Sequence, residues 1–563
     1  MDWQRATILA AILAVSLLLI REWVDFNNRP QLVEATSEQS FDSTTTTDFN
    51  IESASSESGF PQVEDQESSI PQIPSDNETK PALSTENELR FITVKTDTLN
   101  VTINPHGGDI IALSLADHLR DLDSDEPLVL LEQNKKALYI AQSGLIGKNG
   151  TDFSDTNRPI FSVAQTEYQL ADDNDTLNVD LNYQQGDVAI TKRFSFQRGE
   201  HLIGVEYIIN NQSSENWSGI FFGQIKRDGQ KPEVKGGAGF GVQPYWGAAI
   251  TTPDDKYKKL DFGDIAEDEF EVEQTGGWVA MVQHYFISAW IPPQESKNVF
   301  NLKEVKDAYL LTFRTSKFFV PAGEKHAVKA QFYAGPKDID RLEKISPYLD
   351  LTVDYGWLWW IAKPLFHILQ FIHSVVASWG WSIILLTVLI KAIFYVPSAI
   401  GFRSMAKMRK LGPKMAELKE RYGEDRQKMS AELMKIYRKE GVNPMTGCLP
   451  ILIQMPVFLS LYWVLLESVQ LRHTPFLGYI DDLSVMDPYF ILPIIMGVTM
   501  LIQQKLQPAP ADPMQARVMQ FLPIMFTVMF IFFPAGLVLY WVVNNSLSIL
   551  QQWIITRKID AEG

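Results

Sequence analysis

Lys391 is the residue whose surroundings most demand a chemical role. It is the one formally charged side chain between Trp379 and Ile400, in a stretch apolar enough to be a membrane span. At a helical rise of ~1.5 Å per residue it would lie ~18 Å from Trp379 and ~13 Å from Ile400, whereas a lysine side chain reaches only ~6 Å. Lysine in lipid costs roughly 2.5–3.5 kcal/mol. It could cap carbonyl groups or stretch toward the cytoplasm, but we favour a polar, water-filled cavity.

Polar side chains on the other apolar segments are candidates to line such a cavity. Any one of them is more often a helix–helix contact than a site, but together with Lys391 they suggest a groove. None is acidic, whereas an ion-coupled transporter normally needs a buried carboxylate, and the nearest one, Glu467, lies at the outer end of a segment. The candidates are Thr387, Gln454, Thr499, Gln503, Gln504, Thr527, Asn544, Asn545 and Ser546.

Catalytic and metal chemistry have little support in the sequence. The eight histidines form no HExxH motif, and neither a GxSxG motif nor a P-loop occurs. The single cysteine, Cys448, cannot form an intrachain disulfide and has no Cys or His neighbours for a zinc site. No histidine–carboxylate constellation stands out in residues 89–340. We therefore expect no enzymatic activity, no metal site and no cofactor.

Six apolar segments would position these residues. The first, at residues 6–20, is either a secretory signal peptide or an anchor. No small-x-small cleavage triplet follows it, so we favour an uncleaved anchor over residues 1–24. The other candidate spans are residues 379–400, 447–466, 489–506, 519–533 and 537–555. We expect an all-α polytopic bundle whose second span occupies 379–401 and whose third to sixth spans occupy 443–557.

The charge distribution predicts the orientation of these spans. Residues 402–440 carry a formal charge of +6, so the positive-inside rule places this loop and both termini in the cytoplasm. Residues 25–350 carry −23 and belong on the opposite side, which is the periplasm in a double-membrane bacterium. So acidic a block repels phosphate, and we expect no direct DNA binding.

The segments outside the spans differ in composition. Residues 25–88 are rich in Ser, Thr, Glu, Gln and Pro and read as a disordered linker. Short alternating runs broken by Gly, Asn and Pro predict a large all-β sandwich over 89–345. Residues 346–378 read as an amphipathic interfacial helix, with the tilted start of a span as the alternative. Residues 402–442 read as a helical hairpin and 558–563 as a short tail.

Several motifs resemble the YidC family of membrane protein insertases. They are NPMTGCLPILIQMPVF at 443–458, ILPIIMGVTM at 491–500 and FPAGLVLYW at 533–541. The acidic β-domain resembles that of the long Gram-negative form, which has a periplasmic supersandwich similar to sugar mutarotases. The resemblance implies an inner-membrane insertase and chaperone without a cofactor. Its hydrophilic groove, open to the cytoplasm and to the lipid bilayer, receives nascent membrane proteins. The resemblance also implies that the protein works alone or together with the Sec translocon.

The resemblance also assigns roles to individual residues. The family usually has arginine where this chain has Lys391, so the charge is kept and the planar guanidinium fork is lost. Tyr540 and Trp541 occupy the family's sixth-span pair. The tail is short, so contact with the ribosome or targeting machinery falls to Arg421, Arg426 and Lys428 of the hairpin. Two alternatives stay open: a small-solute transporter, and a membrane-tethered periplasmic sugar-binding or epimerase protein.

Overall fold

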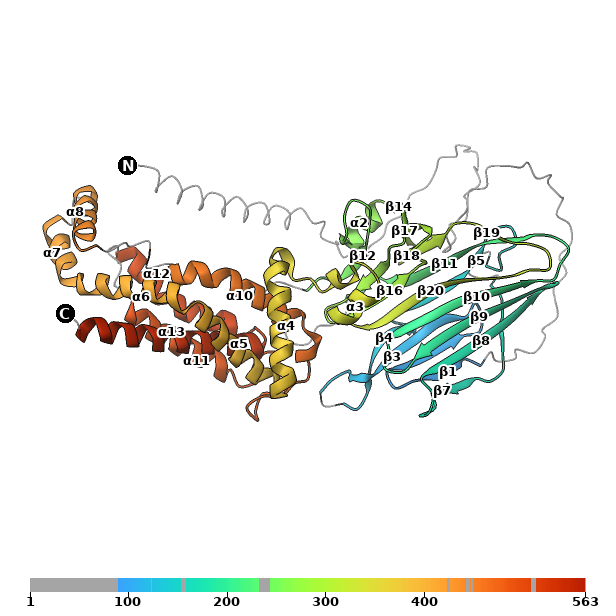
Figure 1. The fold of residues 1–563 in the computed structure, drawn as a ribbon, viewed down its shortest axis with the longest axis horizontal. Helices are drawn as coiled ribbons and strands as arrows, with labels where there is room; N and C mark the ends of the chain where they lie inside the picture. Colours follow the sequence, from blue (N-terminus) through green and yellow to red (C-terminus); the bar gives the residue numbers. More distant parts are fainter. Residues whose placement is uncertain are drawn as a thin grey trace, which may run out of the picture. The chain divides into compact units, whose positions relative to one another are not determined.

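The computed structural model describes residues 90–563 except for several short gaps (Figure 1). The expected anchor at 1–24 and linker at 25–88 lie outside the described residues. The gaps are residue 123 and residues 153–157, 232–243, 423–425, 442–445, 447–448, 508–512 and 562–563.

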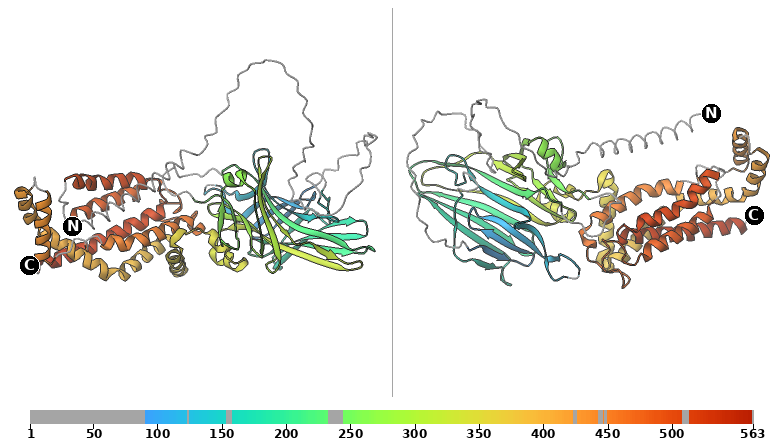
Figure 2. Two further views of the ribbon diagram at one scale, coloured as in Figure 1. Left: turned by 90° about the horizontal axis from the view of Figure 1, so that it is seen from above. Right: turned by 180° about the vertical axis from the view of Figure 1, so that it is seen from behind.

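The first part of the described chain folds into two large β-sheets, which Figures 1 and 2 show from three sides. One sheet has the order β14-β17-β18-β11-β5-β4-β3-β2-β1-β7, with β19 paired to β11. The other has the order β13-β12-β15-β16-β20-β10-β9-β8-β6. Neighbouring strands are antiparallel except for the parallel pair of β1 and β7.

The strand bounds are as follows. The first sheet contains β1 (Ile92–Lys95), β2 (Leu99–Asn104), β3 (Asp109–Leu119), β4 (Pro127–Gln133), β5 (Leu138–Ile146), β7 (Glu167–Gln169), β11 (Trp217–Asp228), β14 (Phe270–Thr275), β17 (Lys297–Val305), β18 (Ala308–Thr315) and β19 (Phe318–Val320). The second contains β6 (Ser162–Val163), β8 (Thr176–Gln185), β9 (Val188–Gln197), β10 (Leu202–Asn211), β12 (Gly247–Ile250), β13 (Lys258–Leu260), β15 (Val279–Val282), β16 (Phe286–Ile291) and β20 (Lys325–Pro336).

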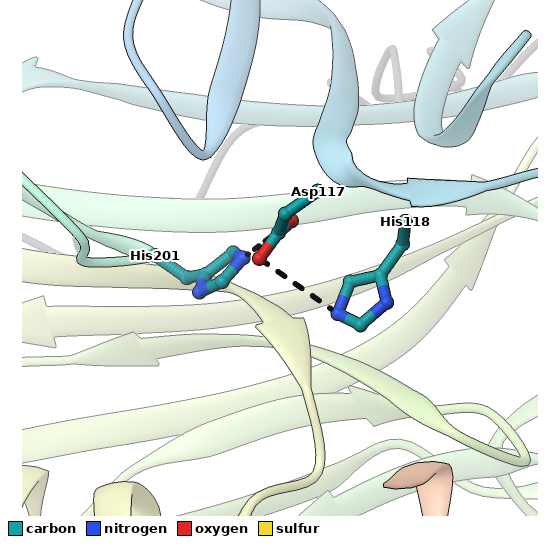
Figure 3. Close-up of side chains that lie close together, drawn as sticks. All are labelled: Asp117, His118 and His201. Atoms are coloured by element: carbon teal, nitrogen blue, oxygen red, sulfur yellow. Dashed lines mark hydrogen bonds and ion pairs between the residues drawn. The ribbon is translucent and has the colours of Figure 1, made fainter. Parts of the chain in front are cut away.

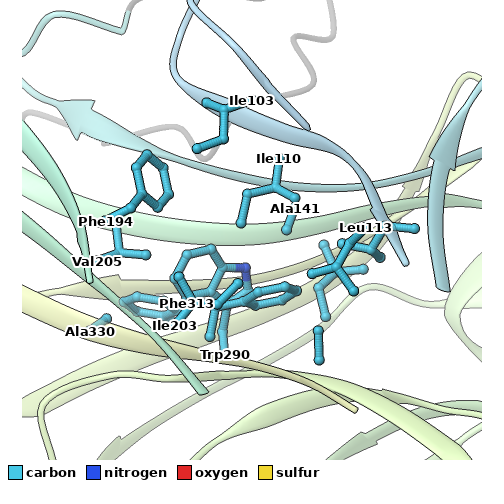
Figure 4. Packing of buried hydrophobic residues seen from close by; sticks show 14 of the residues in the cluster. Ile103, Ile110, Leu113, Ala141, Phe194, Ile203, Val205, Trp290, Phe313 and Ala330 are labelled. Atoms are coloured by element: carbon cyan, nitrogen blue, oxygen red, sulfur yellow. The ribbon is translucent and has the colours of Figure 1, made fainter. Parts of the chain in front are cut away.

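The core of the β-domain follows from strand alternation. In β9 and β10 every second side chain is buried, and these face one apolar cluster between the sheets. Phe194, Ile203, Val205, Trp290 and Phe313 belong to this cluster (Figure 4). The expected β-rich domain followed by a helical region is therefore confirmed.

Strands β15 and β16 are buried on both faces. Their inward side chains join the sandwich core, whereas Ala280, Val282, Ile287 and Ala289 belong to a second apolar cluster. That second cluster also contains residues of the helical region, such as Trp379. The β-domain and the helices thus share buried apolar surface.

The second part of the chain is helical. A short helix, α2 (Phe262–Glu267), lies within the β-domain. The helical region contains α3 (Ile339–Ile345), η1 (Leu349–Thr352), η2 (Gly356–Leu358), α4 (Trp359–Val376), α5 (Trp379–Ile393), α6 (Tyr395–Lys410), α7 (Gly412–Tyr422), α8 (Arg426–Lys439), α10 (Leu449–Glu467), η3 (Val469–Leu471), α11 (Ile491–Leu506), α12 (Pro513–Phe530) and α13 (Ala535–Ala561).

The segment at 379–400 is not the straight rod that its apolar run predicts. Helices α5 and α6 meet at Phe394 with a bend of 70°. Pro397 has no N–H to donate to the carbonyl of Ile393, which interrupts the helical ladder at this point. Over the described residues no single helix has the length and apolarity to cross a membrane unaided, while this bent pair meets that requirement jointly.

The sequence pattern places Leu358, Ile361, Leu365, Ile368 and Ile372 on the apolar side of α4. The structure buries Leu358, Ala362, Phe366 and Leu369, packs the partly buried Leu365 and Ile372 against the same apolar cluster and leaves Ile368 exposed. Apolar residues occur all round this helix, so the neighbouring helices α5 and α10 decide which face is buried. On the polar side of α4, Lys363 Nζ lies 3.1 Å from Asp350 Oδ2 and 3.2 Å from Glu343 Oε2.

Candidate functional site

A groove of about 330 Å³ lies within the helical region. Its wall is mainly apolar and rich in methionine and phenylalanine, with one cation and several amides and hydroxyls. The lining residues are Lys391, Phe402, Met405, Pro450, Gln454, Met455, Phe458, Met500, Gln503, Gln504, Gln507, Met519, Leu522, Pro523, Phe526, Tyr540, Trp541, Asn544, Asn545 and Ser548.

Lys391 supplies the positive charge of this groove. It lies in the last turn of α5, and its Nζ donates a hydrogen bond to Ser548 Oγ at 2.8 Å. Ser548 Oγ donates in turn to the Asn544 carbonyl at 2.8 Å. Within the described part of the chain no carboxylate pairs with Lys391. An ammonium group has three donors, so Lys391 retains hydrogen-bonding capacity for a ligand.

Gln454 and the aromatic pair of α13 form a second polar point in the wall. Gln454 Nε2 donates to the Tyr540 hydroxyl at 2.8 Å. The Phe458 ring packs edge-to-face on Trp541 with 4.4 Å between centroids. The buried Trp541 Nε1 and Asn544 Oδ1 make no hydrogen bond among the described residues. An unpaired donor and an unpaired acceptor therefore lie in the groove wall.

Thr387 and Thr499, two of the predicted groove residues, are not among its lining residues. Each is buried and satisfies its own hydroxyl within its helix: Thr387 Oγ1 donates to the Ile383 carbonyl and Thr499 Oγ1 to the Met496 carbonyl, both at 2.7 Å. Thr499 Oγ1 also accepts from Asn545 Nδ2 at 3.4 Å. These threonines connect helices or satisfy backbone groups, as isolated polar residues in apolar helices commonly do.

Ser548 lines the groove and bonds to Lys391, but it was not among the residues predicted from the sequence. The sequence pointed to Ser546, which is exposed and donates to the Val542 carbonyl. Ser548 follows Asn544 by four residues, so helical periodicity puts both on one face of α13. That spacing was the available signal. No comparable sequence pattern identifies the methionines that line the groove, because methionine is a common core residue.

The predicted cytoplasmic contact residues lie on a helical hairpin formed by α7 and α8. Arg421 and Lys428 are exposed, while the side chain of Arg426 lies outside the described set. The ends of the hairpin are tied together by the Lys414 Nζ–Glu440 Oε1 ion pair at 2.8 Å, and the Tyr437 hydroxyl lies 3.8 Å from Met415 Sδ. The expected helical hairpin is therefore present.

The β-domain contradicts one expectation from the sequence. It brings Asp117, His118 and His201 together (Figure 3). Asp117 and His118 are neighbours in the sequence, but His201 lies far from them. The absence of a histidine–carboxylate constellation in this domain was therefore wrongly predicted. The reason is topological, because β3 and β10 belong to different sheets and their meeting cannot be derived from local spacing.

Two family models match the chain. The YidC periplasmic domain matches residues 91–368, and the 60Kd inner membrane protein family matches residues 371–562. A membrane protein insertase YidC from Cellvibrio japonicus is 55% identical over 565 residues, covering 100% of this chain and 99% of the relative. One from Saccharophagus degradans is 58% identical over 476 residues, covering 84% and 85%. A crystal structure of an active YidC insertase aligns with 83% of this chain and 92% of its own at 17% identity, with a TM-score of 0.36.

Proposed function

Because this chain belongs to the YidC family of membrane protein insertases, we propose that the groove at Lys391 receives the segments that are inserted. The protein is a non-enzymatic insertase of the inner membrane with a periplasmic domain. Its substrates are membrane proteins. The proposal concerns where in the chain they are handled and by which side chains.

The side chains of the groove wall are suited to bind, for a short time, a client segment that has both apolar and polar parts. Methionine and phenylalanine side chains offer adaptable apolar contact to a nascent helix. Lys391 offers charge-assisted hydrogen bonds to the polar or acidic flank that must cross first. The apolar segment then leaves the groove laterally into the lipid, because burying apolar surface there is favourable by roughly 25 cal/mol per Å². The groove need only lower the barrier for the polar flank.

One observation carries this proposal: Lys391, which has no carboxylate partner among the described residues, is the one cation of a mainly apolar groove wall. Its described side-chain partner is the neutral hydroxyl of Ser548, which leaves the positive charge uncompensated. A cation held in a low-dielectric site attracts an incoming anion more strongly than it would in water. Acidic residues near a client segment are the chemistry that this site favours.

Substitution at Lys391 tests the role of the charge. Lys391→Arg should support insertion of a single-span client with an acidic translocated tail, and Lys391→Ala and Lys391→Glu should impair it. Lys505→Ala is the matched control, because Lys505 is an exposed lysine of α11 outside the groove lining. Equal insertion by all four variants would contradict the proposal. A client with a neutral tail should be less affected by the loss of charge.

We further propose that the bent pair α5–α6 and helices α10, α11, α12 and α13 cross the membrane, with both termini in the cytoplasm. Together with a first span at 1–24 this gives six spans. The positive charge of the hairpin and the negative charge of the β-domain support this orientation. The transporter alternative predicts paired broken helices in inverted halves, and the described residues contain one bent pair.

The hairpin of α7 and α8 is our candidate for contact with the ribosome or targeting machinery. Exposed cations there can bind the phosphates of ribosomal RNA. Charge reversal at Arg421, Arg426 and Lys428 should reduce co-sedimentation with ribosomes, whereas removal of residues 558–563 should not. The opposite pattern would refute this assignment. Cooperation with the Sec translocon stays a prediction from family resemblance.

A further inference from the structure

Two histidines and an aspartate converge at the end of β3 and the start of β10 (Figure 3). His201 Nε2 lies 3.2 Å from Asp117 Oδ1, and His118 Nε2 lies 3.9 Å from Asp117 Oδ2. All three candidate ligand atoms lie within 4.8 Å of one another. His201 is buried, His118 is partly exposed and Asp117 is exposed, so the cluster is open to solvent on one side.

The backbone of β3 explains how adjacent residues can point to one place. Successive side chains of a regular strand point to opposite faces, which would separate Asp117 from His118. The pairing of β3 with β4, however, shifts register between Leu115 and Leu119. Such an irregularity re-aims side chains and is common beside functional sites. The register shift therefore lets both residues face His201.

We propose that Asp117, His118 and His201 bind a first-row divalent metal ion, with Zn²⁺ as the best match. Zinc is bound by imidazole nitrogen and carboxylate oxygen at about 2.0–2.2 Å, which puts tetrahedral ligands about 3.3 Å apart. The separation of 3.2 Å between His201 Nε2 and Asp117 Oδ1 is close to that value, whereas His118 Nε2 lies 3.9 Å from the other carboxylate oxygen and would move closer on binding. Two nitrogen ligands disfavour Ca²⁺ and Mg²⁺, which prefer oxygen. Three protein ligands leave a fourth position for water.

The surrounding side chains determine how tightly this site binds. Arg341 Nη1 lies 3.4 Å from His201 Nδ1 and also donates to the Gly199 carbonyl at 2.8 Å. A histidine that binds metal through Nε2 carries its proton on Nδ1, and it needs an acceptor there. Arginine has only donors. Arg341 therefore opposes metal binding and predicts a site of moderate affinity, while Glu200, 3.7 Å from Arg341, partly offsets its charge.

The site also lies where the β-domain contacts the helical region. Arg472, in the connection after η3, donates through Nη2 to the Arg120 carbonyl at 2.7 Å. Its guanidinium lies 5.8 Å from the Phe286 ring, against which His118 packs edge-on with 5.4 Å between ring centroids. A bound ion would fix the end of β3 and thereby hold this contact in place.

Titration of the metal-free full-length protein in detergent with Zn²⁺ tests the proposal. We expect one saturable site by calorimetry. Asp117→Asn and His118→Ala should each weaken binding at least tenfold, and circular dichroism should show that both variants are folded. His326→Ala is the matched control, because His326 is an exposed histidine of β20 outside the cluster. It should bind like the wild type.

Arg341→Gln makes the test specific to the proposed geometry. Glutamine offers an acceptor to Nδ1–H of His201, so Zn²⁺ should bind about tenfold more tightly, as second-shell changes commonly produce. Failure of this variant to tighten binding would contradict coordination through His201 Nε2. The absence of saturable binding, or wild-type affinity in Asp117→Asn or His118→Ala, would overturn the site itself.

Discussion

The ion pair between Lys337 and Glu467 should connect the stability of the β-domain to that of the helices. Lys337 directly follows β20, and Glu467 is the last residue of α10. Lys337 Nζ lies 2.6 Å from Glu467 Oε2, and both side chains are 1% exposed. Beside them, His284 Nε2 lies 2.9 Å from the Leu466 carbonyl. The two parts of the chain thus share a buried polar junction.

The magnitude follows from desolvation. Removing one partner of a buried pair leaves an uncompensated charge, which costs about 3–5 kcal/mol. Replacing both partners with apolar residues of similar volume is often neutral or stabilising. We therefore expect Lys337→Met and Glu467→Leu each to lower the free energy of unfolding by about 3–5 kcal/mol. The double variant should return to wild-type stability or above it.

Chemical denaturation in detergent, followed by far-UV circular dichroism, provides the assay. Strands and helices should unfold together in the wild type and separately in either single variant. The matched control is Lys363→Met, which removes a partly exposed ion pair of α4 and should cost less than about 1 kcal/mol. If the losses of the two single variants simply add in the double variant, the pair is not coupled and the reasoning is wrong.

Two further predictions concern Lys192 and Lys391. Burial in the β-domain lowers the pKa of Lys192 to about 7. Between pH 7 and 10 the unfolded chain therefore binds one more proton than the folded chain, so the free energy of unfolding should rise with pH by up to about 1.4 kcal/mol per pH unit. Lys192→Met should flatten that rise in denaturation curves. Ser548→Ala should remove the hydrogen bond of Lys391 and reduce insertion of acidic-tailed clients, while Ser546→Ala should not; equal insertion rates would refute the positioning role.

Much of the fold follows from local pattern. The alternation in residues 189–196 and 202–209 predicts strands, and the structure forms β9 and β10 there, each slightly longer and with alternating burial. The apolar runs and breaks similarly predict α10, α11, α12 and α13, with boundaries that differ from the observed ones by up to six residues. These features depend on side-chain periodicity and turn residues, which are local properties of the chain.

The site was predictable in part. The isolated charge of Lys391 led directly to the groove, because an unpaired cation in an apolar segment requires a polar environment. Thr387 was expected beside it, but its hydroxyl bonds to its own helix. Which of two nearby serines meets Lys391 depends on the rotation of α13. That rotation is set by packing against other helices rather than by composition.

The features missed altogether depend on long-range geometry. The bend at Phe394 arises where Pro397 removes one hydrogen bond, yet a proline near a helix start is often tolerated. The close packing of Ala362, Phe366 and Leu369 of α4 depends on its neighbours α5 and α10. The cluster of Asp117, His118 and His201 needs a register shift in β3 and the meeting of two sheets.

Site-specific crosslinking to a stalled nascent chain tests the central claim most directly. A photoreactive amino acid at Gln454 or Met500, both in the groove wall, should crosslink to the emerging apolar segment of a client. The same probe at Ile494, which is exposed on α11 and outside the groove lining, should give little product. Strong crosslinks from the two groove positions alone are the predicted result. Equal crosslinking from Ile494, or none from Gln454 and Met500, would contradict the groove as the path of insertion.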